Sequence, residues 1–273
     1  RLTTKVSHKA ILTFFIKNSR FKKLSSKKYS LEDIKKSYYL KKGVSYLFLL
    51  SFLIFTPQNA SSNDFVFNID KTHSEKLGSL IIQDYQGRLK PLNSLAIEIT
   101  NKISKKNEIK NLDANQFFIS MMLYPEIWKT IPIYKVKDEN IKKLLGVDKE
   151  TSYFAFNDIF EKYGSYKLEN ALEIANNKPS STRDNFDKEL IKIDEMLNIS
   201  YSLFIGDFFK VFPLKDDINN KWLNINEAMQ IENEQADVIN KLVKNYYFSL
   251  LEATKTNNWE KADEFLFDIK TYQ

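Results

Sequence analysis

Two histidines, His8 and His73, are the side chains whose ordinary pKa lies nearest to neutral pH. His8 lies among the lysines of the first 42 residues, whereas His73 lies in the longer remainder of the chain. An imidazole can ligate a metal ion or accept a proton, and His73 is the better placed of the two for either role. A lone histidine in a polar stretch is more often a solvent-exposed loop residue. We expect this of His73, with ligand binding as the alternative.

Asp84 and Arg88 are the second group of residues with possible chemistry, because they flank a turn at Gly87. As an ion pair across a hairpin they would be structural, and if exposed they would contribute little to the stability of the fold. Alternatively, Arg88 could bind a carboxylate of another molecule through two parallel hydrogen bonds. The acidic pairs 194–195 and 216–217 are adjacent in the sequence. Nothing in that spacing would give the two carboxylates of a pair separate roles as acid and base, so we interpret them as surface charge.

The composition excludes several kinds of site. The chain has no cysteine, so disulfides, zinc fingers, thiol chemistry and a Cys-x-x-Cys-His motif are all excluded within it. We find no glycine-rich phosphate loop, no cluster of metal ligands and no nucleophile elbow in the sequence. We therefore expect no catalytic residue and no metal site in this chain.

The Asp84–Arg88 turn lies between two predicted elements. The apolar run 80–82 predicts a short strand, and Gly87 supplies the positive φ that a tight turn needs. After Pro91, apolar residues recur at helical spacing up to Ile103, so a helix is predicted to start near Asn93 or Ser94. A strand, a tight turn and an amphipathic helix should therefore position Arg88.

The rest of the chain is typical of a mostly α fold with a few short β-strands. Asp113 is a predicted N-cap, and Asp184 or Asn185 is predicted to cap a long helix. Further predicted helices cover 139–145, 157–163 and 167–177, a helical turn covers 222–229, and a helical hairpin forms the last fifty residues, turning at 257–258. The predicted extended pieces are 131–136 and 208–213, and 151–156 is a short apolar segment.

The charge distribution predicts a membrane-anchored chain. Residues 1–42 contain 13 Lys and Arg but only two Asp and Glu, whereas the remainder carries a net charge of −5. Nucleic-acid binding needs basic residues on the folded surface, so this distribution argues against it. A basic block before the uncharged run 44–55 is typical of a cytosolic flank. We predict a basic cytosolic tail (1–42), a short transmembrane anchor (43–56), a linker (57–73) and an extracytoplasmic, mostly helical domain (74–273).

Two alternatives remain for the apolar run, which is short for a full span: a cleaved signal-type segment or an interfacial one. The chain begins at Arg1, and we expect it to be part of a longer protein.

The stretch around the turn resembles a known family. Its pattern is Gln83-Asp84-x-x-Gly87-Arg88-x-Lys90-Pro91-x-Asn93-Ser94-Leu95-Ala96. This is similar to the segment just upstream of the heme-handling half of the fused system II cytochrome c synthases, of the ResB/CcsB–CcsA type. The stretches 18–24 and 186–195 and the closing Tyr272-Gln273 also fit that family.

The resemblance implies a role in cytochrome c biogenesis at the bacterial cytoplasmic membrane, with the main domain on the periplasmic side. It implies that the partners are the membrane, the heme-handling transmembrane half and apocytochrome c. The family is a heme lyase, but its heme-holding histidines and tryptophan-rich motif belong to regions that this chain does not match. Heme is therefore expected outside this segment, and His73 and Arg88 are the candidates for contact with it. This segment would be a scaffold or linker.

Two other functions stay open from the sequence. One is a membrane-anchored helical module that binds peptides or proteins and has no link to heme. The other is an extracytoplasmic enzyme whose site the sequence does not reveal.

Overall fold

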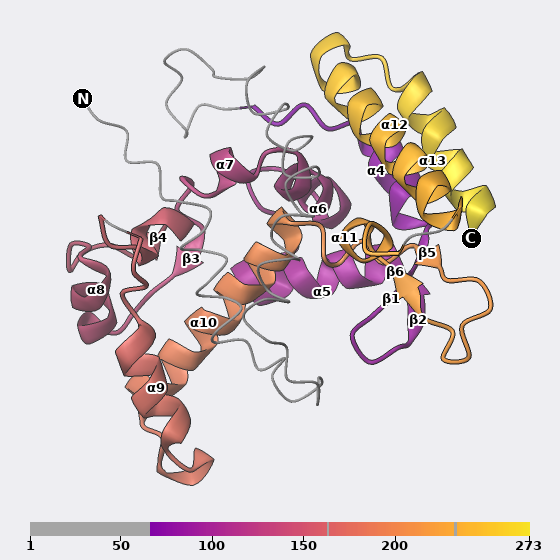
Figure 1. Ribbon diagram of the computed structural model, residues 1–273. Coiled ribbons are helices and arrows are strands. Elements are labelled where there is room, and N and C mark those ends of the chain that lie inside the picture. Colours follow the sequence, from indigo (N-terminus) through magenta and orange to yellow (C-terminus); the bar gives the residue numbers. More distant parts are fainter. Residues whose placement is uncertain (1–65, 163, 232–233) are drawn as a thin grey trace. The chain divides into compact units, whose positions relative to one another are not determined.

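A computed structural model describes residues 66–162, 164–231 and 234–273 (Figure 1). Residues 66–161 and 166–273 form one compact unit, which is described below. The predicted basic tail and anchor, and most of the predicted linker, lie outside the described residues. In the part of the chain that is described, no helix combines the length and the apolar composition needed to cross a bilayer.

The described part is mostly helical with a few short strands, which confirms the predicted secondary-structure class. Its α-helices are α4 (Lys71–Gly78), α5 (Leu92–Ser104), α6 (Ala114–Leu123), α7 (Pro125–Trp128), α8 (Glu139–Leu145), α9 (Glu169–Asn177), α10 (Asn185–Phe204), α11 (Ile225–Ala228), α12 (Glu234–Thr256) and α13 (Glu260–Tyr272). Two 3₁₀ turns are η2 (Phe156–Ile159) and η3 (Ser180–Thr182). The strands form antiparallel pairs: β1 (Ile81–Gln83) with β2 (Leu89–Pro91), β3 (Tyr134–Lys135) with β4 (Tyr153–Phe154), and β5 (Phe212–Pro213) with β6 (Trp222–Leu223).

Several helix ends follow from the sequence as predicted. The Asp113 carboxylate accepts the Gln116 N–H at 2.9 Å, and the Gln116 side chain accepts the Asp113 N–H at 3.1 Å, so the start of α6 is capped from both sides. Asp184 and Asp187 form the same reciprocal pair at the start of α10. Gly146 ends α8 in the left-handed region at φ 72°.

Two predicted helical segments differ in the structure. The helical turn predicted over 222–229 is wrong in its first half, because Trp222 and Leu223 pair with Pro213 and Phe212 as strand β6. The helix itself starts only after Asn224, whose side chain caps it. The described part of the helix predicted from 157 to 163 is instead the short turn η2, which ends at Ile159. In η2, the Asn157 N–H donates to the Lys129 carbonyl at 2.9 Å, a partner outside the segment itself.

Helices α5, α6 and α10 pack together around the core, and α4 packs against α5, α6 and α13. Phe117, Phe118 and Trp128 are fully buried there. Phe67, near the end of the predicted linker, is also buried and stacks on Trp128 at a centroid distance of 4.5 Å. Figure 1 shows the predicted helical hairpin, α12 with α13 in yellow, beside α4. This hairpin covers the helix that carries His73.

Candidate functional site

The turn with Asp84 and Arg88 joins β1 to β2. Ile82 lies opposite Lys90, and Gln83 lies opposite Leu89. The Asp84 N–H donates to the Arg88 carbonyl at 2.9 Å, and the Gly87 N–H donates to the Asp84 carbonyl at 3.0 Å. Gly87 has φ +79°, a conformation that costs glycine little. The predicted turn geometry is confirmed.

The Asp84 carboxylate organises this turn. Its Oδ1 accepts the backbone N–H groups of Gln86 at 2.9 Å and of Arg88 at 3.0 Å. Its Oδ2 accepts from Nε of Arg88 at 3.0 Å and from Nη2 at 2.8 Å. Burial acts to raise the pKa of Asp84, but the hydrogen bonds from Arg88 and the turn backbone together hold that pKa below its ordinary value. The predicted ion pair is confirmed, and it locks the turn.

Arg88 lies on the surface even though its partner does not. Its side chain is 67% exposed, whereas that of Asp84 is 8% exposed. Lys90 lies next to the pair, 3.8 Å from Asp84 Oδ2 and 2.7 Å from Glu98. The guanidinium is therefore within reach of a carboxylate on another molecule.

Gln83 and Gln273 connect this hairpin to distant parts of the chain. The Gln83 side chain donates to the Asn220 carbonyl at 2.9 Å and accepts the Trp222 N–H at 2.8 Å. The Gln273 amide nitrogen donates to the carbonyls of Ile81 at 2.7 Å and Val211 at 3.1 Å, and its oxygen accepts the Ile81 N–H at 3.2 Å. The two glutamines thus fix β1 against the 211–222 region. Hydrophobic periodicity gives no sign of these contacts.

His73 occupies a different environment from the one predicted. It lies inside α4, where its own N–H donates to the N-cap side chain of Asp70 at 2.7 Å, and its side chain is fully buried. The expectation of an exposed loop residue is wrong, because α4 begins at Lys71 and the α12–α13 hairpin covers it. Trp259 packs on the imidazole at a centroid distance of 5.0 Å.

Both ring nitrogens of His73 have hydrogen-bond partners. Nδ1 lies 2.7 Å from Asp263 Oδ1, and Nε2 lies 2.9 Å from the Tyr246 hydroxyl. Burial lowers the pKa of His73 and outweighs the opposing effect of Asp263, so the neutral ring is favoured. A carboxylate only accepts, so Nδ1–H donates to Asp263 and Nε2 accepts the Tyr246 O–H. A metal ion needs a free ring nitrogen, and this arrangement leaves none.

Asp263 carries the other end of the network. It also pairs with Lys76 on α4. Burial acts to raise the pKa of Asp263, but the hydrogen bonds from Lys76 and His73 hold that pKa below its ordinary value. Burial raises the pKa of Tyr246 well above its ordinary value, which keeps the hydroxyl protonated. The network therefore joins α4 to α12 and α13 through a charged carboxylate and a neutral ring.

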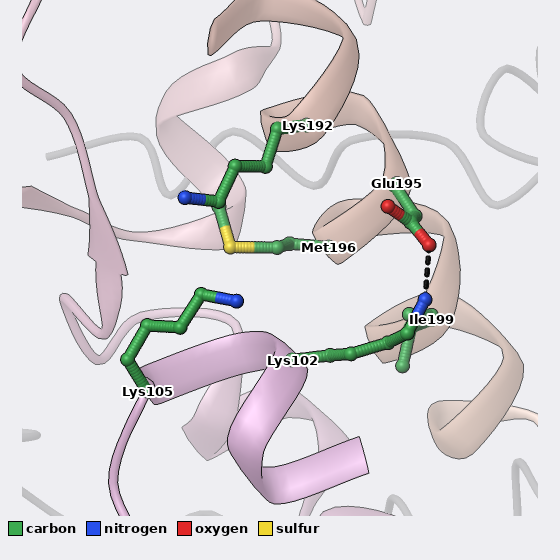
Figure 2. A pocket seen from close by; sticks show the side chains of 6 residues that line it. All are labelled: Lys102, Lys105, Lys192, Glu195, Met196 and Ile199. Atoms are coloured by element: carbon green, nitrogen blue, oxygen red, sulfur yellow. Dashed lines mark hydrogen bonds and ion pairs between the residues drawn. The ribbon is translucent and has the colours of Figure 1, made fainter. Parts of the chain in front are cut away.

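A small pocket lies between α5 and α10 (Figure 2). Its volume is about 200 Å³, and its lining residues are Lys102, Lys105, Lys192, Glu195, Met196 and Ile199. Glu195, predicted as surface charge, forms an ion pair with Lys102. The pocket is smaller than the roughly 300–1,000 Å³ that drug-sized ligands occupy. Among the described residues, no group of three or more His, Asp or Glu is placed to hold a metal ion.

Most of this chain is similar to one segment of a known bacterial protein. No family model matches the chain. The chain is 34% identical over 201 residues to protein NrfI of Wolinella succinogenes. This match covers 73% of the chain but only 22% of NrfI, so the chain spans about a fifth of the length of that relative. Over nearly three quarters of its length, the chain is thus similar to one segment of the much larger NrfI.

Proposed function

We propose that this chain is the extracytoplasmic scaffold segment of a membrane protein of cytochrome c biogenesis, the process that delivers heme and attaches it to apocytochrome c. Two similarities support the proposal. The pattern from Gln83 to Ala96 resembles the fused system II cytochrome c synthases, and the similarity to NrfI supports a role in cytochrome c biogenesis. The resemblance and the comparison with NrfI thus point to the same process.

The observation that carries the scaffold role is that the fold joins the stretches that resemble the family. Gln83 holds the 220–222 segment, and Gln273, from the closing pair of residues, holds both backbone groups of Ile81. Lys102 of α5, the helix that follows the hairpin, pairs with Glu195 at the end of the 186–195 stretch. These side chains join backbone segments and helices, and two of them, Lys102 and Glu195, also line the small pocket between α5 and α10. Such an arrangement favours a structural, supporting role over a catalytic one.

The proposed arrangement along the chain follows the sequence interpretation. Residues 1–42 would be the cytosolic tail, 43–56 the anchor and 57–73 the linker, with 74–273 on the periplasmic side of the cytoplasmic membrane. The end of that linker, from Val66 onward, packs as part of the domain. Heme would be held by regions outside this segment, and the thioether bonds to the Cys-x-x-Cys-His motif of apocytochrome c would form there. No residue of this segment takes part in bond formation under this proposal.

Two residues have proposed roles toward partners. Arg88 is the proposed contact for a heme propionate or for a carboxylate of apocytochrome c, because it is two-thirds exposed and held in place by Asp84. His73 is proposed to be structural, because both of its ring nitrogens are hydrogen-bonded. Heme titration of the chain should therefore give no tight complex. In particular, we expect no shifted Soret band that disappears in the His73→Ala variant.

The proposal is tested with the full-length protein that carries this segment. We expect that protein, in a bacterium lacking its own maturation system, to yield a heme-stained cytochrome c reporter. Replacing residues 74–273 by a flexible linker should abolish the reporter while the membrane-embedded half still accumulates. Arg88→Ala should lower the yield, and Lys188→Ala, a surface lysine of α10, should not. Undiminished heme attachment after the replacement would overturn the scaffold role, and a full-length protein with no membrane-embedded part would overturn the proposal itself.

A further inference from the structure

The pocket between α5 and α10 has an unbalanced charge. Lys102 and Lys105 reach it from the end of α5, and Lys192 reaches it from α10, as Figure 2 shows. Glu195 is the one carboxylate that lines the pocket, and it is already paired with Lys102. Among the described residues, neither Lys105 nor Lys192 forms an ion pair with a carboxylate. Two lysines that line the pocket thus have no carboxylate partner within the described part of the chain.

Helix electrostatics accounts for only part of this cluster. Lysines near the C-terminus of a helix are favourable because of the helix dipole, and Lys102 and Lys105 are at the C-terminal end of α5. Lys192 is different, since it lies well inside α10, which runs from Asn185 to Phe204. The helix dipole therefore does not explain why Lys192 lies beside the other two lysines.

The floor of the pocket is apolar. Met196 is 5% exposed, and Ile199 is partly buried next to it. A methionine side chain is flexible and polarisable, so it adapts to the shape of an apolar group. The pocket thus combines an apolar floor with ammonium groups at its border, which is the complement of an anionic head on a short apolar stem.

We propose that this pocket binds a carboxylate carried on a short apolar stem. The carboxylate would lie between Lys105 and Lys192, and the stem would lie against Met196 and Ile199. A volume of about 200 Å³ suits one such arm and not a whole macrocycle. The same chemistry has two sources, a free short-chain carboxylic acid and the propionate of a tetrapyrrole. Only the second source rests on the function proposed above.

The test uses the full chain, with its methionine methyl groups labelled with ¹³C for NMR. The chain has four methionines. The Met196 signal is assigned with Met196→Leu, and fully buried Met121 is the internal control. Hexanoate should shift the Met196 signal saturably and leave the Met121 signal unchanged. Hexanol, which has no charge, and inorganic phosphate, which has no stem, should each bind at least tenfold more weakly.

Charge-removing variants locate the site. Lys192→Gln should weaken hexanoate binding about tenfold, as loss of a charge-assisted hydrogen bond does. Lys188→Gln removes the same charge from the same helix, one turn earlier and outside the pocket lining, and should leave the affinity unchanged. Circular dichroism confirms that both variants are folded. Equal binding of hexanol, no shift of Met196 with hexanoate, or equal effects of the two variants would each overturn the proposal.

A competition experiment distinguishes the two sources. Metal-free mesoporphyrin, which carries two propionates, is added to the hexanoate complex, and its dimethyl ester is the uncharged control. Displacement by the free acid alone identifies a tetrapyrrole propionate as a ligand of the pocket. Hexanoate binding without displacement identifies a free carboxylic acid. That second result supports the pocket and leaves the cytochrome assay to decide the proposed function separately.

Discussion

The β1–β2 turn and the His73 network both use a carboxylate to fix a basic side chain, but they do so in opposite settings. Asp84 and Arg88 are four residues apart, and the arginine side chain is 67% exposed. His73 is fully buried, and its partners Tyr246 and Asp263 lie 173 and 190 residues further along the chain. The first pair shapes a local turn, whereas the second holds the last two helices against α4.

This difference predicts which of the two regions contributes more to the free energy of unfolding. An exposed ion pair contributes at most about 1 kcal/mol, because water and salt screen it. A buried polar group left without its partner costs about 1–3 kcal/mol, and a cavity adds to that cost. The His73 network should therefore dominate stability. The turn should matter mainly for the position of Arg88.

The largest expected effect follows from removing the buried ring. His73→Ala should lower the free energy of unfolding by about 3 kcal/mol, because it opens a cavity and leaves Asp263 and Tyr246 without the imidazole. Tyr246→Phe, which removes one hydroxyl, should cost about 1 kcal/mol. Urea unfolding of the full chain measures both. A His73→Ala variant as stable as wild type would show that the hairpin does not depend on this network.

A second effect is a pH dependence just below pH 6.5, whereas that of the turn lies at more acid pH, where Asp84 titrates. The pKa of folded His73 lies below the ordinary value of 6.5, so the unfolded chain binds the proton more readily. The contribution of His73 to stability is therefore complete above pH 6.5 and is lost as the pH falls below it toward the lower folded-state pKa. Urea titrations between pH 8 and 5 measure this slope.

The two histidines provide the control for that slope. His73→Gln should flatten the slope below pH 6.5, whatever its effect on stability at pH 8. His8→Gln, which removes the other histidine of the chain, should leave the slope unchanged. If the two variants changed the slope equally, buried His73 would not be its source.

The smallest effect is expected at the turn. Arg88→Ala should change the free energy of unfolding by about 0.5 kcal/mol, and the change should shrink in high salt. Asp84→Ala should cost more, about 1 kcal/mol, because its carboxylate also accepts two backbone N–H groups. Urea unfolding in low and high salt compares them. An Arg88→Ala effect as large as that of His73→Ala would reverse the comparison between the two regions.

The same contrast explains what the sequence could predict. The Asp113 cap, the Asp184 cap, the Gly87 turn and the Asp84–Arg88 pair all depend on partners within four residues, and each is confirmed. Strand β6 was missed because its partner, β5, lies about ten residues away and the two make only a short pair. The burial of His73 was missed because the helices that cover it lie far along the chain. Hydrophobic periodicity indicates that a helix has an apolar face. It does not indicate which distant polar residue that face will bury.

Gln273 has a consequence for how a partner can bind the hairpin. In β1, the outward-facing backbone groups belong to Ile81 and Gln83, and Gln273 binds both groups of Ile81 while the Lys210 carbonyl accepts the Gln83 N–H. In β2, Pro91 has no N–H to offer. An incoming peptide therefore finds no free row of hydrogen-bonding groups on β1 to extend the sheet. A partner of this hairpin would therefore have to contact side chains and not the β1 edge, and Arg88 at the tip is the proposed contact.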